Sequence, residues 1–123
     1  MPTSNEQTDE ILQLVKNFVE EQAGFLKLRF PTRNGILFLH PSEILYLTAD
    51  NNYTHIHTTD GGTEITAQNL GKVHKALPQQ HFIRINRSTV VNGRYLKRYD
   101  KPRKKCIIAC NASTREFDVN KGL

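Results

Sequence analysis

Residues 82–92 read Phe-Ile-Arg-Ile-Asn-Arg-Ser-Thr-Val-Val-Asn, and this stretch predicts two strands joined by a polar tip. Ile83 and Ile85 alternate with polar residues in the period of two that is typical of a half-buried strand. The apolar pattern resumes at Val90 and Val91. The polar residues between the two apolar parts are therefore expected at the exposed end of a β-hairpin.

Charge is unevenly distributed around this stretch. Nine basic residues and one acidic residue lie between positions 84 and 105, whereas the whole chain carries a formal net charge of only +5. The first 24 residues carry five acids and a single lysine, so an acidic lead-in precedes a basic body. Concentrated positive charge attracts a polyanion by releasing its condensed counterions, and nucleic acid is the commonest partner of that kind. The alternative is a solvated lysine-rich surface.

The chain is long enough for one domain with its own core, since 123 residues can bury roughly two thirds of their unfolded surface. Cys106 and Cys110 share one apolar run. If that run is a strand, their alpha carbons lie about 13 Å apart, too far for a disulfide. They are expected to be small buried hydrophobes in a reducing cytoplasm. No apolar run or leader pattern indicates membrane insertion or secretion.

Residues 1–24 are expected to form a helical lead-in or linker, and residues 25–123 the domain proper. Apolar residues recur at helical spacing in the lead-in, at Ile11, Leu14, Val15, Phe18 and Val19. This amphipathic stripe can dock on its own domain, pair with a second copy, or end a connector from another domain.

The remaining pattern predicts a mainly-β domain of about ten short strands with one short internal helix. Asn69 can cap that helix, Leu70, Val73 and Leu77 line one side of it, and Pro78 ends it. The strands are expected at residues 26–30, 36–39, 44–49, 53–59, 63–67, two parts of 82–92, 96–99, 105–110 and 114–119.

Four fragments in this order resemble the LytTR DNA-binding domain of bacterial response regulators. They are Asp50-Asn51-Asn52-Tyr53, Thr59-Asp60-Gly61, a helix ending in Leu77-Pro78, and Phe82-x-Arg84-x-x-Arg87-Ser88-x-x-Val91-Asn92. The likeness spans about residues 25 to 121. It implies stacked small antiparallel sheets and a transcriptional regulator that binds specific duplex DNA. It also implies that loop side chains, and not a recognition helix, enter successive major grooves.

Carried over residue by residue, the resemblance implies three DNA-contacting regions. Asn86, Arg87, Asn52 and Tyr53 are the expected base readers, because arginine can read guanine and asparagine can read adenine through paired hydrogen bonds. The expected contacts to the DNA backbone come from Arg84, Ser88, Asn51, Lys104 and Lys121.

Several of these positions allow a second interpretation. Arg84 can form a structural ion pair as readily as a phosphate contact, and Tyr53 can be a half-buried strand residue. Asn92 is assigned mainly to turn geometry. Lys121 stands where relatives often have arginine, and it lacks the planar fork that pairs with guanine, so a phosphate contact is expected there. Asn86 stands where a histidine is frequent.

Other classes of function have less support in the sequence. His55 and His57 share one strand face, but two possible ligands without a third do not predict a metal site. No phosphate loop or nucleophile motif is present, so no enzyme activity and no cofactor are expected. The alternative is a protein-interaction or RNA-binding module on the same β scaffold. Readers of single-stranded RNA expose aromatic rings, and this chain has no tryptophan, which favours duplex DNA. Repeated half-sites, and a homodimer formed through the lead-in helix or on DNA, are the expected mode of binding.

Overall fold

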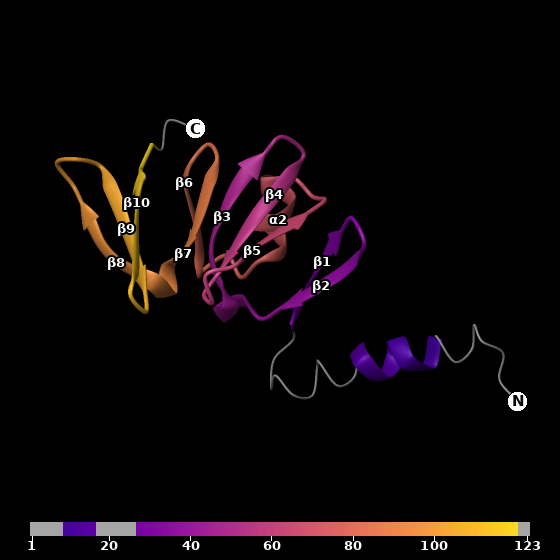
Figure 1. Cartoon of the computed structure of the whole chain (residues 1–123). Helices are drawn as coiled ribbons and strands as arrows, with labels where there is room; N and C mark the ends of the chain where they lie inside the picture. The colour runs from indigo at the N-terminus through magenta and orange to yellow at the C-terminus, as the bar shows by residue number, and fades with distance from the viewer. Residues whose placement is uncertain (1–8, 17–26, 121–123) are drawn as a thin grey trace, which may run out of the picture.

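The computed structural model describes residues 9–16 and 27–120 (Figure 1). Residues 9–16 are helical, and the rest of the described chain holds ten strands, one α-helix and two short 3-10 helices. The predicted mainly-β fold with one short internal helix is confirmed. The elements are β1 (Leu28–Thr32), β2 (Gly35–Leu39), η1 (Pro41–Glu43), β3 (Ile44–Asp50), β4 (Tyr53–Thr58), β5 (Thr63–Thr66), α2 (Leu70–Ala76), β6 (Phe82–Asn86), β7 (Thr89–Asn92), η2 (Gly93–Tyr95), β8 (Leu96–Asp100), β9 (Lys105–Cys110) and β10 (Ser113–Asp118).

Three small antiparallel sheets make up the body, as Figure 1 shows. The central sheet has five strands in the order β5-β4-β3-β7-β6. A two-stranded sheet of β1 and β2 lies to one side of it, and a three-stranded sheet in the order β10-β9-β8 lies to the other. The prediction of several small antiparallel sheets is therefore confirmed.

One face of the central sheet packs against α2 and the β1–β2 hairpin. Ile44 and Leu47 of β3 and Ile56 of β4 form this core together with Leu70 and Val73 of α2. These two helix residues lie on the apolar side that their spacing predicts. The apolar side of α2 is therefore buried in the core, and its lysine side faces solvent.

The other face of the central sheet packs against the three-stranded sheet. Leu45 and Tyr46 of β3 form this second core with Cys106 and Ile108 of β9. Both cysteines are free thiols on β9, Cys106 buried and Cys110 half-buried. The expectation that they do not bridge each other is confirmed.

The first hairpin turn is shorter than its sequence predicts. Pro31 and Thr32 lie beyond the strand expected at residues 26–30, but they extend β1, so only Arg33 and Asn34 connect the strands. Proline is tolerated in this strand because a two-stranded sheet leaves one side of each strand unpaired. The Pro31 carbonyl accepts hydrogen bonds from the Ala67 backbone N–H at 2.9 Å and the Thr66 hydroxyl at 2.8 Å.

Asn92 connects distant parts of the chain, which its predicted role in a turn did not include. Its side-chain oxygen accepts a hydrogen bond from the Arg94 N–H at 3.0 Å, and this caps η2. Its amide nitrogen donates to the carbonyls of Ile44 at 2.8 Å and Pro41 at 3.2 Å. The residue is 2% exposed. Asn92 therefore ties the end of β7 to the start of β3.

Replacement of Asn92 by alanine should destabilise the fold by about 2–4 kcal/mol, because buried backbone groups lose their partners. Urea unfolding measures this difference directly. Asn52→Ala, in an exposed turn, serves as the matched control and should change the free energy of unfolding by less than about 0.5 kcal/mol. Equal effects of the two substitutions would show that Asn92 is not a structural tie.

The helix of residues 9–16 presents apolar side chains to solvent. Ile11 is 61% exposed and Leu14 is 66% exposed. Phe18 and Val19, the last two residues of the predicted stripe, lie outside the described residues. Docking of the stripe on its own domain therefore finds no support in the described part of this helix. Within the described ranges, no helix is long and apolar enough to cross a membrane.

Candidate nucleic-acid interface

Three chain segments meet at one end of the central sheet. The β3–β4 turn, the β6–β7 turn and the end of β10 all lie at the upper edge of Figure 1. Hydrogen bonds join them: the Ala49 N–H donates to the Ser88 carbonyl at 2.9 Å, and the Asn120 N–H donates to the Ile85 carbonyl at 2.8 Å. The regions expected to contact DNA are therefore brought together, although Lys121 lies outside the described residues.

The first tip is the two-residue turn Asn51-Asn52 between β3 and β4. Asn51 has a φ of 55°, in the left-handed region that asparagine tolerates better than most residues. The Asp50 carboxylate accepts a hydrogen bond from His55 Nε2 at 3.0 Å beside the turn. Tyr53 is 51% exposed, so its ring is available at this end of the sheet.

The second tip, between β6 and β7, is held by its own side chains. The Asn86 carboxamide oxygen accepts hydrogen bonds from the Ser88 N–H at 2.9 Å and the Ser88 hydroxyl at 3.3 Å. Arg84 donates from Nη2 to the Arg87 carbonyl at 2.5 Å and from Nε to the Asn86 carbonyl at 3.4 Å. The tip backbone is thus fixed from within, and the side chain of Arg87 is exposed.

Arg84 braces this tip through the carbonyls of Asn86 and Arg87, in place of the structural ion pair that was its second interpretation. No acidic side chain in the described part of the chain pairs with it. Its Nη1 has no hydrogen-bond partner among the described residues. The three-residue spacing from Arg84 to Arg87 across a tight turn is the sequence signal that could have indicated this contact.

Asn86 also has most of its hydrogen-bonding capacity in use. Besides the two bonds that its oxygen accepts, its amide nitrogen donates to the Asp118 carbonyl at 2.8 Å. This bond fastens the end of β10 to the tip. A carboxamide has two amide hydrogens, so one donor is left. In this arrangement Asn86 can donate to a single acceptor, whereas paired recognition of adenine also needs its oxygen.

Ion pairs reduce the free positive charge near the tips. Arg103 pairs with Asp100 at 3.6 Å and with Glu116 at 2.9 Å, and Lys105 pairs with Asp118. Lys104 lies between them with an exposed side chain that has no partner among the described residues. Its carbonyl accepts a hydrogen bond from the Val119 N–H at 2.9 Å, which places this loop beside the end of β10. Of Arg103, Lys104 and Lys105, Lys104 is therefore the one without an ion-pair partner among the described residues.

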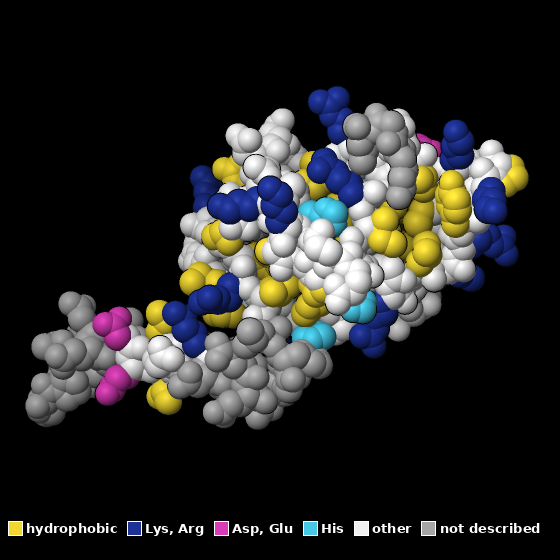
Figure 2. Space-filling model, turned by 180° about the vertical axis from the view of Figure 1, so that it is seen from behind, with side chains coloured by type: hydrophobic (Ala, Val, Ile, Leu, Met, Phe, Trp, Pro, Cys, Tyr) yellow, Lys and Arg dark blue, Asp and Glu magenta, His cyan; other side chains and the backbone are white. Residues whose placement is uncertain are grey.

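The body as a whole remains basic. In Figure 2, Lys and Arg side chains are spread over the body, while acidic side chains stand out on the N-terminal helical segment.

Comparisons with known proteins agree with this architecture. The family model described as the LytTr DNA-binding domain matches residues 34–116. The chain belongs to the LytTr DNA-binding domain family. The resemblance inferred from the sequence is confirmed.

Two known proteins resemble this LytTr domain. The Sensory transduction protein LytT of Bacillus subtilis is 29% identical over 84 residues, which cover 68% of this chain and 34% of LytT. The chain thus spans about a third of the length of this relative. A LytTr DNA-binding domain from Bacillus cereus has the same fold, with a TM-score of 0.57 and 22% identity over 73% of this chain and 84% of that one.

The two histidines of β4 have partners within the LytTr domain. The His57 ring stacks on Tyr46 at 4.1 Å between ring centroids, and its Nε2 lies 2.9 Å from the Thr48 hydroxyl. His55 pairs with Asp50 at the first tip. Among the described residues, no group of three His, Cys, Asp or Glu side chains could hold a metal ion.

Burial lowers the pKa of His57 below its ordinary value of 6.5, and the nearby His55 and Arg115 lower it further. Below pH 6.5 the unfolded chain therefore binds a proton that the folded domain resists. Burial lowers the pKa of His40 in the same direction.

The domain should lose stability as the pH falls from 7.5 to 5.5, seen as a lower urea midpoint. In His57→Gln this loss should be smaller but still present, because His40 contributes to it as well. Glutamine keeps a hydrogen-bonding group near Thr48 and cannot take up a proton. If the parent and the variant lose the same stability over this interval, His57 is not part of the pH dependence.

Proposed function

We propose that this LytTr domain is the DNA-reading part of a bacterial transcriptional regulator and that it binds specific duplex sequences through its two tips and the chain segment that follows β10. The observation that carries the proposal is the hydrogen-bonded cluster of tips at one end of the central sheet, which presents Arg87 from a braced turn. The reading domain comprises residues 25–123, with residues 1–24 as its lead-in.

Arg87 is the principal base reader in this proposal. Its backbone is fixed while its side chain is exposed, so the guanidinium can pair with guanine O6 and N7 at little cost in backbone entropy. Asn86 contributes its remaining amide hydrogen. Asn52 and Tyr53 read bases from the first tip.

The contacts to the DNA backbone come from the residues around these readers. The Ser88 hydroxyl and the free Nη1 of Arg84 hold phosphates on either side of Arg87. Asn51 does so at the first tip. Lys104 and Lys121 add attraction that does not depend on sequence.

The tips enter successive major grooves as turns, without a recognition helix. A major groove is about 12 Å wide and admits a two-stranded β-ribbon as well as a helix. The internal helix α2 is only seven residues long, and its buried Leu70 and Val73 hold it against the central sheet. Its position in the core supports reading by turns.

The surface favours duplex DNA over single-stranded RNA. Exposed large aromatic side chains in the described chain are Tyr53 at the first tip and Tyr99 on β8. Single-strand readers stack successive bases on neighbouring rings. One ring at the tips is a poor platform of that kind.

Selection of bound sites from a random duplex library tests the proposal and defines the preferred sequence. On the selected site, Arg87→Ala should weaken binding by about 1–3 kcal/mol and relax the preference at one base pair. Lys104→Ala should weaken binding to every sequence alike and reduce the salt dependence. Fluorescence anisotropy on selected and scrambled duplexes at two salt concentrations measures both effects.

Two outcomes would contradict these assignments. If the library yields no preferred sequence, the proposed specificity is wrong. If Arg87→Ala binds the selected duplex as tightly as the parent does, another residue reads the base. Lys101→Ala provides a matched control for the loss of a loop charge.

Repeated half-sites are the proposed arrangement, because one set of tips reaches only a few base pairs. The helix of residues 9–16 is the proposed coupler between two copies, since Ile11 and Leu14 are exposed.

Leu14→Glu should lower affinity for a duplex with two half-sites several-fold and leave binding to a single half-site unchanged. Gln13→Glu adds the same charge beside the apolar position and serves as the control. Equal loss on one and two half-sites would indicate that the helix does not couple two copies.

A further inference from the structure

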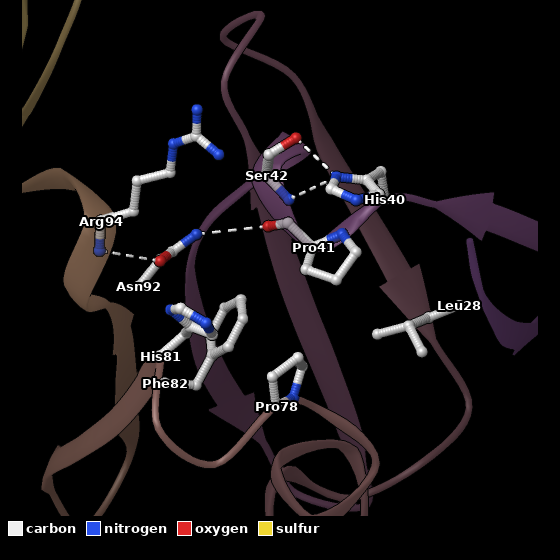
Figure 3. A pocket seen from close by; sticks show the side chains of 9 residues that line it. All are labelled: Leu28, His40, Pro41, Ser42, Pro78, His81, Phe82, Asn92 and Arg94. Atoms are coloured by element: carbon white, nitrogen blue, oxygen red, sulfur yellow. Dashed lines mark hydrogen bonds between the residues drawn. The ribbon is translucent and has the colours of Figure 1, made fainter. Parts of the chain in front are cut away.

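A cavity of about 580 Å³ opens at the end of the central sheet opposite the tips (Figure 3). The chain connects the two ends directly, because β3 runs from Ile44 beside the cavity to Asp50 at the first tip. These seven residues span roughly 20 Å at about 3.3 Å per residue. The cavity is therefore remote from the proposed DNA contacts.

The cavity is built from separate segments that hydrogen bonds hold in place. Asn92 donates to Pro41, the Gly93 N–H donates to the His81 carbonyl at 2.7 Å, and the Tyr95 hydroxyl donates to the Ser42 carbonyl at 2.5 Å. The walls are thus joined to one another and not only to the sheet. A site whose walls are fixed in advance binds a ligand with little ordering cost.

The lining of the cavity combines apolar side chains with one cation, Arg94. Leu28, Pro41, Pro78 and Phe82 present mostly apolar surface to the cavity. Arg94 stands at its edge in Figure 3.

The guanidinium of Arg94 is exposed and has no hydrogen-bond or ion-pair partner within the described ranges, and the same holds for the ring of His81. Lys27 adds positive charge near His40, which lines the cavity. Burial lowers the pKa of His40, with Glu43 opposing this and Arg94 and Lys27 adding to it. The cations thus exceed the acids around the opening.

We propose that this cavity binds a small organic carboxylate with an apolar body. The carboxylate pairs with the two donors of the Arg94 fork at the edge of the cavity. The apolar body occupies the space between Leu28, Pro78 and Phe82. The volume lies within the range of about 300–1,000 Å³ that is typical of small-molecule sites.

Arg94 is hard to explain as a DNA contact, because it lies at the wrong end of β7. It follows Asn92, the last residue of β7, whereas the tip precedes the first residue, Thr89. An inorganic anion could satisfy its charge, but it would leave the apolar surface of the cavity exposed to water. An anion with a hydrocarbon part fits both the Arg94 guanidinium and the apolar lining.

Titration of the full chain, labelled with 15N, with benzoate tests this site. Benzoate should shift the amide resonance of Gly93 saturably, with a Kd in the millimolar range, because that amide donates to His81 in the cavity wall. Benzamide, which has the same ring without the charge, should bind at least tenfold more weakly. Inorganic phosphate, which has the charge without the ring, should do the same.

Substitutions of Arg94 test whether its guanidinium binds the carboxylate of benzoate. Arg94→Gln should weaken benzoate binding at least fivefold, and Arg94→Lys should be intermediate because lysine keeps the charge without the fork. Arg98→Gln removes an exposed charge from β8 and should bind benzoate like the parent. The amide spectrum of each variant reports whether it is folded, and Arg94→Lys carries the test if Arg94→Gln is not.

Several results would overturn the proposal. These are the absence of saturable shifts at Gly93 with benzoate, equal binding by the parent and Arg94→Lys or Arg94→Gln, and phosphate binding as tight as benzoate binding. Each of these can be observed without DNA, so the outcome does not depend on whether the tips read a specific sequence.

Discussion

The burial of β3 on both faces is the constraint on which the rest of the structure depends. Ile44 and Leu47 pack toward α2, while Leu45 and Tyr46 pack toward the three-stranded sheet. A slip of one residue along the ladder would move core side chains such as Leu47 to the opposite face of the sheet. The position of β3 is therefore fixed along its length. Because the first tip follows its last residue and the cavity adjoins its first, both ends of the sheet inherit that fixed position.

Local patterns in the sequence predicted the elements well, because their causes are local. Alternation of apolar residues defines a strand, and a run such as Asp60-Gly61-Gly62 supplies the backbone freedom of a turn, with Gly61 at a φ of +90°. The extent of β1 was missed because Pro31 looks like a turn residue unless its strand is known to lie in a two-stranded sheet. The short helix η2 was missed for a similar reason, since its cap, Asn92, is itself held by carbonyls near residue 44.

The roles of individual polar side chains were predicted less completely, because their partners are distant in sequence. Asn86 donates to a carbonyl 32 residues away, and no spacing pattern indicates that bond. The charge count had the same weakness. Nine basic residues between 84 and 105 suggested a larger free charge than the structure holds, since Arg103 and Lys105 find acids on β10, outside that interval. Folding thus leaves fewer unpaired cations in the described chain, with Lys104 among those that remain.

The two tips of the central sheet are held at a fixed orientation to each other, and this bears on how a duplex is read. β3 and β7 pair from Tyr46 with Val91 to Thr48 with Thr89. Asn92 fastens the two strands at the cavity end, and the bond from Ala49 to Ser88 fastens them at the tip end. A ladder closed at both ends allows little independent movement of the turns. Grooves of a duplex recur at a fixed spacing, so turns held in this way need little further ordering when they bind. Side chains on rigid turns can therefore be as selective as those of a recognition helix.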